Sequence, residues 1–199
     1  MGDSNRYNDI ILQSARLFRE KGYPSTSIRD IADAVNINSA SLYYHFKNKE
    51  AILLEVMLYG VRVVHKAVQD ILRRDKDLWM RVRDGLRTHL LISIEYQDFA
   101  AVHLQEMRHL RSEARAKVIA ERDNYEKMWE DIIDEAVNAQ LIKPGVDTRL
   151  LRLHGFGALN WIVTWYRPHG DYTPEEIIDA FLKNMRQGVF QPEAMIISK

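Results

Sequence analysis

The 199-residue sequence contains no cysteine, which excludes disulfide bonds and thiolate chemistry and is typical of a reducing compartment. No apolar run approaches the ~18 residues that a membrane-spanning helix requires. The first residues, Met1–Arg6, also lack the apolar stretch of a secretion signal. Lys and Arg together number 28, as do Asp and Glu, so the net charge is zero. These absences predict a soluble cytoplasmic protein without a membrane partner.

Motifs of catalysis are also missing. The sequence has no Gly-rich nucleotide loop, nucleophile elbow or zinc motif. The spacing Glu106-x-x-His109 is typical of di-iron helical bundles, which are an alternative function class. Such a site needs a second copy, and none of the other six His residues has Glu three positions before it. His103 and His109 lie six residues apart, on different helix faces. We therefore predict no enzymatic activity, no metal and no cofactor.

The apolar spacing predicts an all-α protein of about nine helices. Apolar residues recur every three or four positions through most of the chain, and no strand pattern or internal repeat is present. Three short helices are expected in the first 48 residues. Six more are expected at about 49–74, 78–96, 99–110, 113–140, 147–166 and 173–190. Thr173 is the predicted N-cap of the last helix, with Pro174 in its first position.

Residues 26–46 predict two short helices joined by a tight turn. Ser27 and Asp30 form an Asp variant of the capping box at the start of the first helix. Asn36, which tolerates a left-handed backbone, is the expected turn residue, and Asn38 is the expected N-cap of the second helix. Leu42 and Phe46 are four residues apart and should both point inward. This pattern is typical of a helix-turn-helix that binds DNA; the alternative is an ordinary helical hairpin.

The outward residues of the second helix fit a DNA major groove. Ser39, Ala40 and Ser41 are small enough for a close approach to the base edges. Tyr43, Tyr44 and His45 are long side chains with polar tips that reach phosphates or a thymine methyl. Lys49 begins the next helix at a position suited to a phosphate. The predicted DNA-binding residues are Thr26, Ser27, Arg29, Asn38, Ser39, Ala40, Ser41, Tyr43, Tyr44, His45 and Lys49.

The first quarter of the chain resembles the DNA-binding domain of the tetracycline-repressor (TetR) family of bacterial regulators. The matching residues are Ala15, Phe18, Gly22-Tyr23, Thr26, Ile31-Ala32 and the run from Leu42 to Glu50. The resemblance implies a repressor with a DNA-binding domain over 1–48 and an effector-binding and dimerisation domain over 49–199. Asn36 and Ala40 stand where many relatives have Gly, so the bases that this helix contacts cannot be transferred from a relative.

Residues 1–50 hold seven basic and six acidic side chains, a net charge of only +1. Bulk electrostatics therefore cannot supply the affinity for DNA. We expect binding through locally placed groups, doubled by dimerisation, and a shallow dependence on salt.

The last two long helices predict a homodimer. They carry small residues followed by tryptophans and then a broad apolar band, which is more apolar surface than one subunit needs. The resemblance implies pairing of these helices as a four-helix bundle on a palindromic operator. The alternative is burial within one subunit. The predicted interface residues are Gly155, Ala158, Ile162, Trp165, Ile178, Phe181, Leu182 and Met185.

The middle helices are expected to enclose a small-molecule effector that releases the DNA. Polar residues interrupt their apolar stripes, which a dry core avoids. The alternative is plain core. The predicted ligand-binding residues are His89, Tyr96, Phe99, His103, Met107, Arg122, Tyr125 and Trp129.

A narrower resemblance concerns the effector. Leu159-Asn160-Trp161 and Trp165-Tyr166-Arg167-Pro168 look similar to the end of family members that control fatty-acid or sterol breakdown and respond to acyl-CoA. On that resemblance, basic side chains are candidates for the nucleotide phosphates: Arg108, Arg111, Arg115, Lys117 and Arg122. A solvated charged surface is the alternative for these residues. A DNA-binding dimer without any effector is the alternative for the protein.

Overall fold

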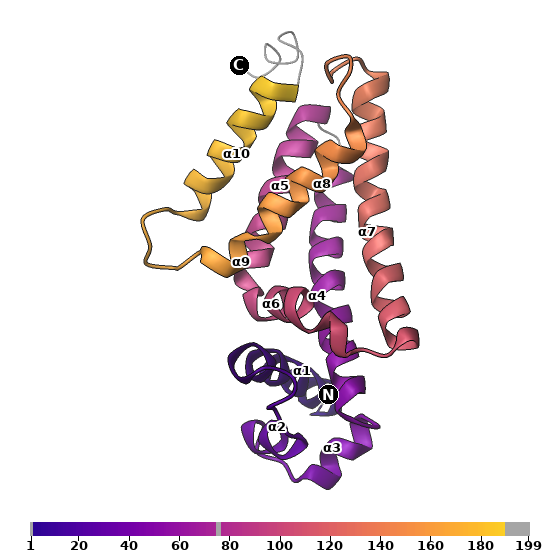
Figure 1. Ribbon diagram of the computed structural model, residues 1–199, viewed down its shortest axis with the longest axis vertical. Coiled ribbons are helices and arrows are strands. Elements are labelled where there is room, and N and C mark those ends of the chain that lie inside the picture. The colour runs from indigo at the N-terminus through magenta and orange to yellow at the C-terminus, as the bar shows by residue number, and fades with distance from the viewer. Residues whose placement is uncertain (1, 75–76, 190–199) are drawn as a thin grey trace. The chain divides into compact units, whose positions relative to one another are not determined.

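The computed structural model describes residues 2–74 and 77–189, with side chains from 6 to 188. The elements of this part of the chain are α1 (Gly2–Lys21), α2 (Ile28–Ala34), α3 (Ser39–His45), α4 (Lys49–Leu72), α5 (Leu78–Glu95), α6 (Gln97–Glu106), the 3-10 turn η1 (Met107–His109), α7 (Ser112–Asn138), α8 (Thr148–Asn160), α9 (Ile162–Trp165) and α10 (Pro174–Val189). The all-α prediction is confirmed. Because α9 is a single turn that follows α8 after a break at Trp161, the expectation of about nine helices also holds (Figure 1).

The short helices end where their cap residues require. Ser27 and Asp30 form the complete capping box of α2. Asn36 has φ 55°, the left-handed conformation that ends this helix. The Asn38 side chain then accepts a hydrogen bond from the backbone N–H of Ser41, at 2.7 Å, and so caps α3. Local chemistry therefore sets where these two helices begin and end.

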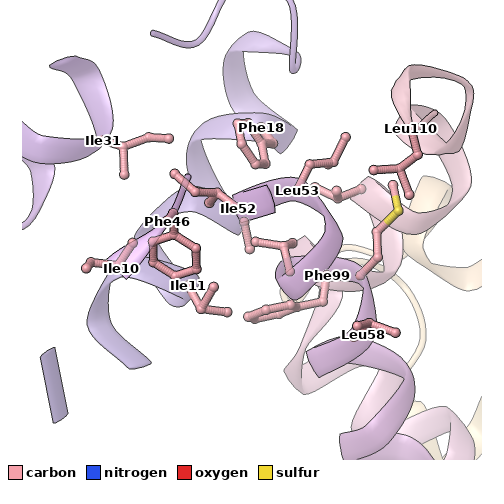
Figure 2. Close-up of a cluster of buried hydrophobic side chains, with 14 of the residues drawn as sticks. Ile10, Ile11, Phe18, Ile31, Phe46, Ile52, Leu53, Leu58, Phe99 and Leu110 are labelled. Carbon is pink, nitrogen blue, oxygen red and sulfur yellow. The ribbon is translucent and has the colours of Figure 1, made fainter. Parts of the chain in front are cut away.

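The chain folds into two compact units, which we call unit 1 (residues 1–62 and 96–122) and unit 2 (residues 63–95 and from 123 onward). α4 and α7 each contribute to both. These units do not coincide with the functional division expected at residue 48, which stays a prediction. Figure 2 shows the core of unit 1, where Phe18, Phe46 and Phe99 lie among aliphatic side chains of α1, α2 and α4. Leu42 and Phe46 are buried, as predicted.

Polar contacts join one end of α6 to α1 and the other end to the loop after α1, within unit 1. The Arg19 guanidinium donates to Asp98 at 2.6 Å, in the first turn of α6. The buried Glu106 carboxylate, at the last residue of α6, accepts from the backbone N–H of Tyr23 at 3.3 Å. Helix α6 also lies close to α4, because a methyl group on Gly60 would come within 2.9 Å of Phe99 Cβ. The helix-turn-helix is thus embedded in a larger packed unit.

In unit 2, α5 packs against α8, α9 and α10. The core of unit 2 includes Trp79, Leu90, Trp129, Ile162 and Ile178, all less than 9% exposed. Thr173 caps α10 by a reciprocal pair of contacts with Glu176, as predicted. No helix in the described ranges is long and apolar enough to cross a membrane.

Candidate nucleic-acid interface and buried polar site

One face of α3 is exposed and polar. Tyr44 is 81% exposed and Tyr43 is 54% exposed, although both are large side chains that a folded protein usually covers. Ala40 and Ser41 are also exposed, and Ser39 and His45 are half-buried. Leu42 and Phe46 hold the opposite side of the helix in the core of unit 1. Unit 1 therefore presents the residue types that the sequence predicted for a major groove.

The cap residues lie beside this face. The Asn38 side-chain oxygen also accepts from the Ser41 hydroxyl at 2.9 Å, so it orients that hydroxyl. Ser27 is exposed, and its hydroxyl is engaged by the Asp30 carboxylate. The Arg29 side chain is 86% exposed and lies 3.7 Å from Asp33. A surface pair at this distance is weak, so its guanidinium is available to a phosphate.

Two predicted DNA-binding residues make structural contacts within unit 1. Thr26 is 1% exposed, and its hydroxyl donates to the Gly22 carbonyl at 2.9 Å, so it has no surface to offer DNA. The Lys49 ammonium donates to the carbonyls of Tyr23 and Thr26 at 2.8 and 2.7 Å and lies 4.3 Å from the centre of the Tyr23 ring. Lys49 therefore holds the α1–α2 loop. Lys49 is only half-buried, so its contact with a phosphate stays a prediction, whereas Thr26 has no exposed side chain for DNA.

Unit 2 contains a buried polar site that joins α5, α7 and α8. His89, 3% exposed, lies 2.7 Å from the Tyr125 hydroxyl through Nδ1 and 3.1 Å from Asn160 Oδ1 through Nε2. Aromatic rings enclose it: the centre of the Phe156 ring lies 5.1 Å from that of His89 and 5.4 Å from that of Trp129. The structure thus brings together three predicted ligand-binding residues, His89, Tyr125 and Trp129. Phe156 and Asn160 were not among the predicted ligand-binding residues.

The hydrogen bonds define the protonation of this site. Asn160 Oδ1 can only accept, so His89 Nε2 must carry the proton. In a neutral ring Nδ1 is then an acceptor and receives the Tyr125 O–H. Burial lowers the pKa of His89 to about 4 and raises the pKa of the Tyr125 hydroxyl. Both groups are neutral at pH 7, which suits recognition of an uncharged polar group such as a carbonyl.

The low pKa of His89 predicts acid sensitivity. The pKa of His89 is about 4 in the folded chain and 6.5 in the unfolded chain. Between these two values the unfolded chain binds a proton at His89 that the folded chain does not bind. The contribution of the neutral His89 to the free energy of unfolding is fully present above pH 6.5. It is lost progressively as the pH falls to about 4, by about 3 kcal/mol in total. Urea unfolding between pH 7.5 and 4.5 measures the slope. His89→Gln should make the slope shallower and the exposed His154→Gln should not; equal slopes for wild type and His89→Gln would contradict the assignment.

The other predicted ligand-binding residues belong to unit 1. Phe99 is 4% exposed and belongs to the buried core of this unit. Tyr96 and Met107 pack against the same core. His103 has a buried Nδ1 without a hydrogen-bond partner, and burial followed by the charge of Arg122 lowers its pKa to about 4. Arg122 itself is exposed.

An apolar cavity of about 30 Å³ adjoins the polar site in unit 2. Its lining includes Leu86, Trp129, Phe156 and Phe181. A volume of this size holds about one or two water molecules, not an acyl chain of several carbons. Any larger effector would therefore have to displace these aromatic side chains.

The basic residues between 108 and 122 belong to unit 1, and several have partners. Arg111 lies 3.4 Å from Glu50, Lys117 lies 3.1 Å from Glu113, and Arg115 donates to backbone carbonyls. His109 Nε2 is 3.2 Å from Glu106 Oε2. Among the described residues, no three acidic or His side chains cluster as metal ligands would.

The predicted dimer interface requires correction. Ile162, Ile178 and Leu182 are 1%, 0% and 6% exposed, so they are already covered by their own unit and have no surface left to bury. A Cβ atom added to Gly155 would lie 3.7 Å from the ring of Phe181 in the same unit. Phe181 and Met185 are half-buried. Only Ala158 and Trp165 of the predicted set are exposed.

A different apolar surface lies on α8 and the residues after it. We call Leu150, Leu153, Gly157 and Trp161 the α8 stripe; the two leucines are each 48% exposed and Trp161 is 62% exposed. Their spacing places them on one helix face. The small residues and tryptophans of this segment, Gly157 and Trp161 among them, were the basis of the sequence prediction of pairing, which did not include Leu150 or Leu153. Three large exposed apolar side chains in a row indicate an interaction surface.

Comparisons with known proteins agree with this geometry. A family profile described as bacterial regulatory proteins, tetR family, matches residues 10–56. A second, described as the tetracyclin repressor-like C-terminal domain, matches residues 75–189.

Relatives match along nearly the whole chain. The HTH-type transcriptional repressor KstR2 of Mycobacterium tuberculosis is 28% identical over 195 residues, covering 94% of each chain. The fatty acid metabolism regulator protein of Bacillus subtilis is 25% identical over 191 residues, covering 92% of this chain and 95% of that protein. A solved structure of AibR in complex with isovaleryl coenzyme A and operator DNA has a TM-score of 0.81 and 30% identity, covering 90% of this chain and 97% of the other.

Proposed function

This chain belongs to the TetR family of bacterial regulatory proteins, and from that premise we propose that it is a cytoplasmic repressor released from operator DNA by an acyl-CoA. It acts by binding, not by catalysis. The observation that carries the proposal is the exposed face of α3, where Tyr44 is 81% exposed while Leu42 and Phe46 anchor the helix from behind. Exposed aromatic side chains beside small residues on a helix fit a DNA groove.

DNA binding by this surface requires two copies. The domain with the helix-turn-helix carries a net charge of only +1 in its first 50 residues, so a single copy has little electrostatic attraction to phosphate. Pairing through the α8 stripe would place two α3 helices on one palindromic operator. Half-sites then lie about 34–36 Å apart, or a small multiple of this distance.

The effector proposal rests on the buried polar site and its aromatic walls. A thioester carbonyl could accept the Tyr125 O–H that His89 now receives, with the acyl chain displacing Phe156 and Trp129. AibR was solved with isovaleryl coenzyme A and operator DNA, and the Bacillus subtilis relative is named for fatty acid metabolism, which supports an acyl-CoA effector here.

A gel-shift titration against the upstream DNA of the gene tests the proposal. Isovaleryl-CoA and palmitoyl-CoA are added separately, with free CoA and the matching free acids as controls. We expect the DNA complex to be lost only with an ester. A complex that persists with every ester, or that is lost with free CoA alone, would contradict the acyl-CoA proposal while leaving DNA binding intact.

The small cavity favours a second candidate, an architectural DNA-binding dimer without an effector. At about 30 Å³ it offers no preformed space for an acyl chain. Thermal stability discriminates between the two, because a ligand that binds only the folded state must raise the melting temperature. An increase with one ester favours the regulated repressor, whereas no increase with any ester favours the architectural protein.

A further inference from the structure

We propose that Arg6, on α1, is a DNA-backbone anchor that seats one sugar-phosphate strand against the recognition helix. This inference rests on the proposed function, because it assigns a phosphate contact within the same interface. Arg6 lies outside the helix-turn-helix sequence and was not among the predicted DNA-binding residues.

Arg6 and α3 line the same hollow, which is open to solvent. The lining in unit 1 consists of Arg6 together with residues of the turn and of α3, including Asn38, Ser41 and Tyr44. No Asp or Glu is among the residues that line it. The lining side chains supply a guanidinium, amides and hydroxyl groups, all of which donate hydrogen bonds to phosphate oxygens.

The charge pairing of unit 1 singles out Arg6. Most of its Lys and Arg side chains lie near an acid: Arg16 with Glu20, Arg19 with Asp98, Lys21 with Asp30, Arg29 with Asp33, Arg62 with Glu121, Arg111 with Glu50 and Lys117 with Glu113. Lys49 and Arg115 donate to backbone carbonyls, Arg108 donates to His109, and Arg122 also has an interaction. Among the side chains that the structure describes in this unit, Arg6 and Lys47 are the cations without a partner.

Of these two cations, Arg6 alone lines the hollow. A guanidinium without an internal partner loses no ion pair on meeting a phosphate, and it can bind two phosphate oxygens at once. The hollow therefore combines an uncommitted cation with the exposed hydroxyl groups of α3. This arrangement would fix the register of α3 in the groove without contributing base specificity.

Salt dependence of DNA binding tests this assignment. Arg6→Ala should make the slope of log K against log salt shallower by about 0.9 per protomer, hence about 1.8 per dimer. Its affinity should fall by a similar factor for the operator and for unrelated DNA, because phosphates carry no sequence. Arg6→Lys, which keeps the charge, should retain most of the slope. The matched control is Arg16→Ala, an exposed arginine on the same helix that is paired with Glu20.

The outcomes separate this inference from the proposed function. An unchanged slope, or a loss confined to the operator, would overturn the role of Arg6 while leaving the repressor in place. Absence of any DNA binding by the wild-type protein would overturn the proposed function itself. Should Arg6→Ala fold poorly by thermal melting, Arg6→Gln provides the same charge removal with a longer polar side chain, and its slope decides.

Discussion

Tyr44→Ala should lower operator affinity by about 30-fold or more, because a lost base or phosphate contact costs about 1–3 kcal/mol in each half-site. The side chain is 81% exposed and its ring meets only the edge of His45, so its removal takes little from the core. Fluorescence anisotropy with a labelled operator measures the affinity, and thermal melting verifies that the fold is unchanged. Tyr44→Phe separates the hydroxyl group from the ring.

The matched control for this prediction is Tyr172→Ala. Tyr172 is 63% exposed, but it lies in the loop before α10, in unit 2. It should bind operator as the wild type does. An unchanged affinity for Tyr44→Ala, or an equal loss for both variants, would contradict the placement of α3 in the groove.

Local chemistry made the helix-turn-helix predictable. Ser27 with Asp30, Asn36 and Asn38 act within three or four residues of their own positions, and each residue type has one dominant use there. The inward pair Leu42 and Phe46 follows from helical spacing alone. For these features, the sequence contains all the information that the geometry requires.

Contacts between distant residues could not be predicted in the same way. The Lys49 ammonium donates hydrogen bonds to carbonyls more than 20 residues earlier in the chain. Nothing in the sequence next to Lys49 distinguishes that role from a phosphate contact. His89 and Asn160 are 71 residues apart. Their hydrogen bond depends on how α5 packs against α8, which periodicity does not specify.

The surface that pairs two copies could not be predicted from the sequence either. An amphipathic helix has an apolar face, but the pattern does not say whether its own chain or a partner covers that face. For α10 the chain itself covers Ile178 and Leu182. For α8 the stripe at Leu150, Leu153 and Trp161 stays exposed within the chain. The exposed fraction of each side chain in the folded chain, not its hydrophobicity, separates the two cases.

Leu153→Glu should convert the dimer into a monomer and lower operator affinity by about 10²–10⁴-fold, because the advantage of engaging two half-sites at once is lost. A carboxylate placed in an apolar interface also loses hydration without gaining a partner. Light scattering coupled to size-exclusion chromatography gives the oligomeric state, and anisotropy gives the affinity. Leu104→Glu is the control, since Leu104 is equally exposed at 48% but lies on α6 in unit 1.

The interface predicted from the sequence also included residues of α10, and a substitution there should act differently from Leu153→Glu. Ile178 is fully buried within its own subunit, so Ile178→Glu should lower the melting temperature of the protein sharply. Leu153 is half exposed, so Leu153→Glu should leave a folded monomer whose circular dichroism matches that of the wild type. A dimer that survives Leu153→Glu would remove the α8 stripe from the interface. A monomer that is also unfolded would mean that pairing and folding of unit 2 are a single event, as in obligate dimers.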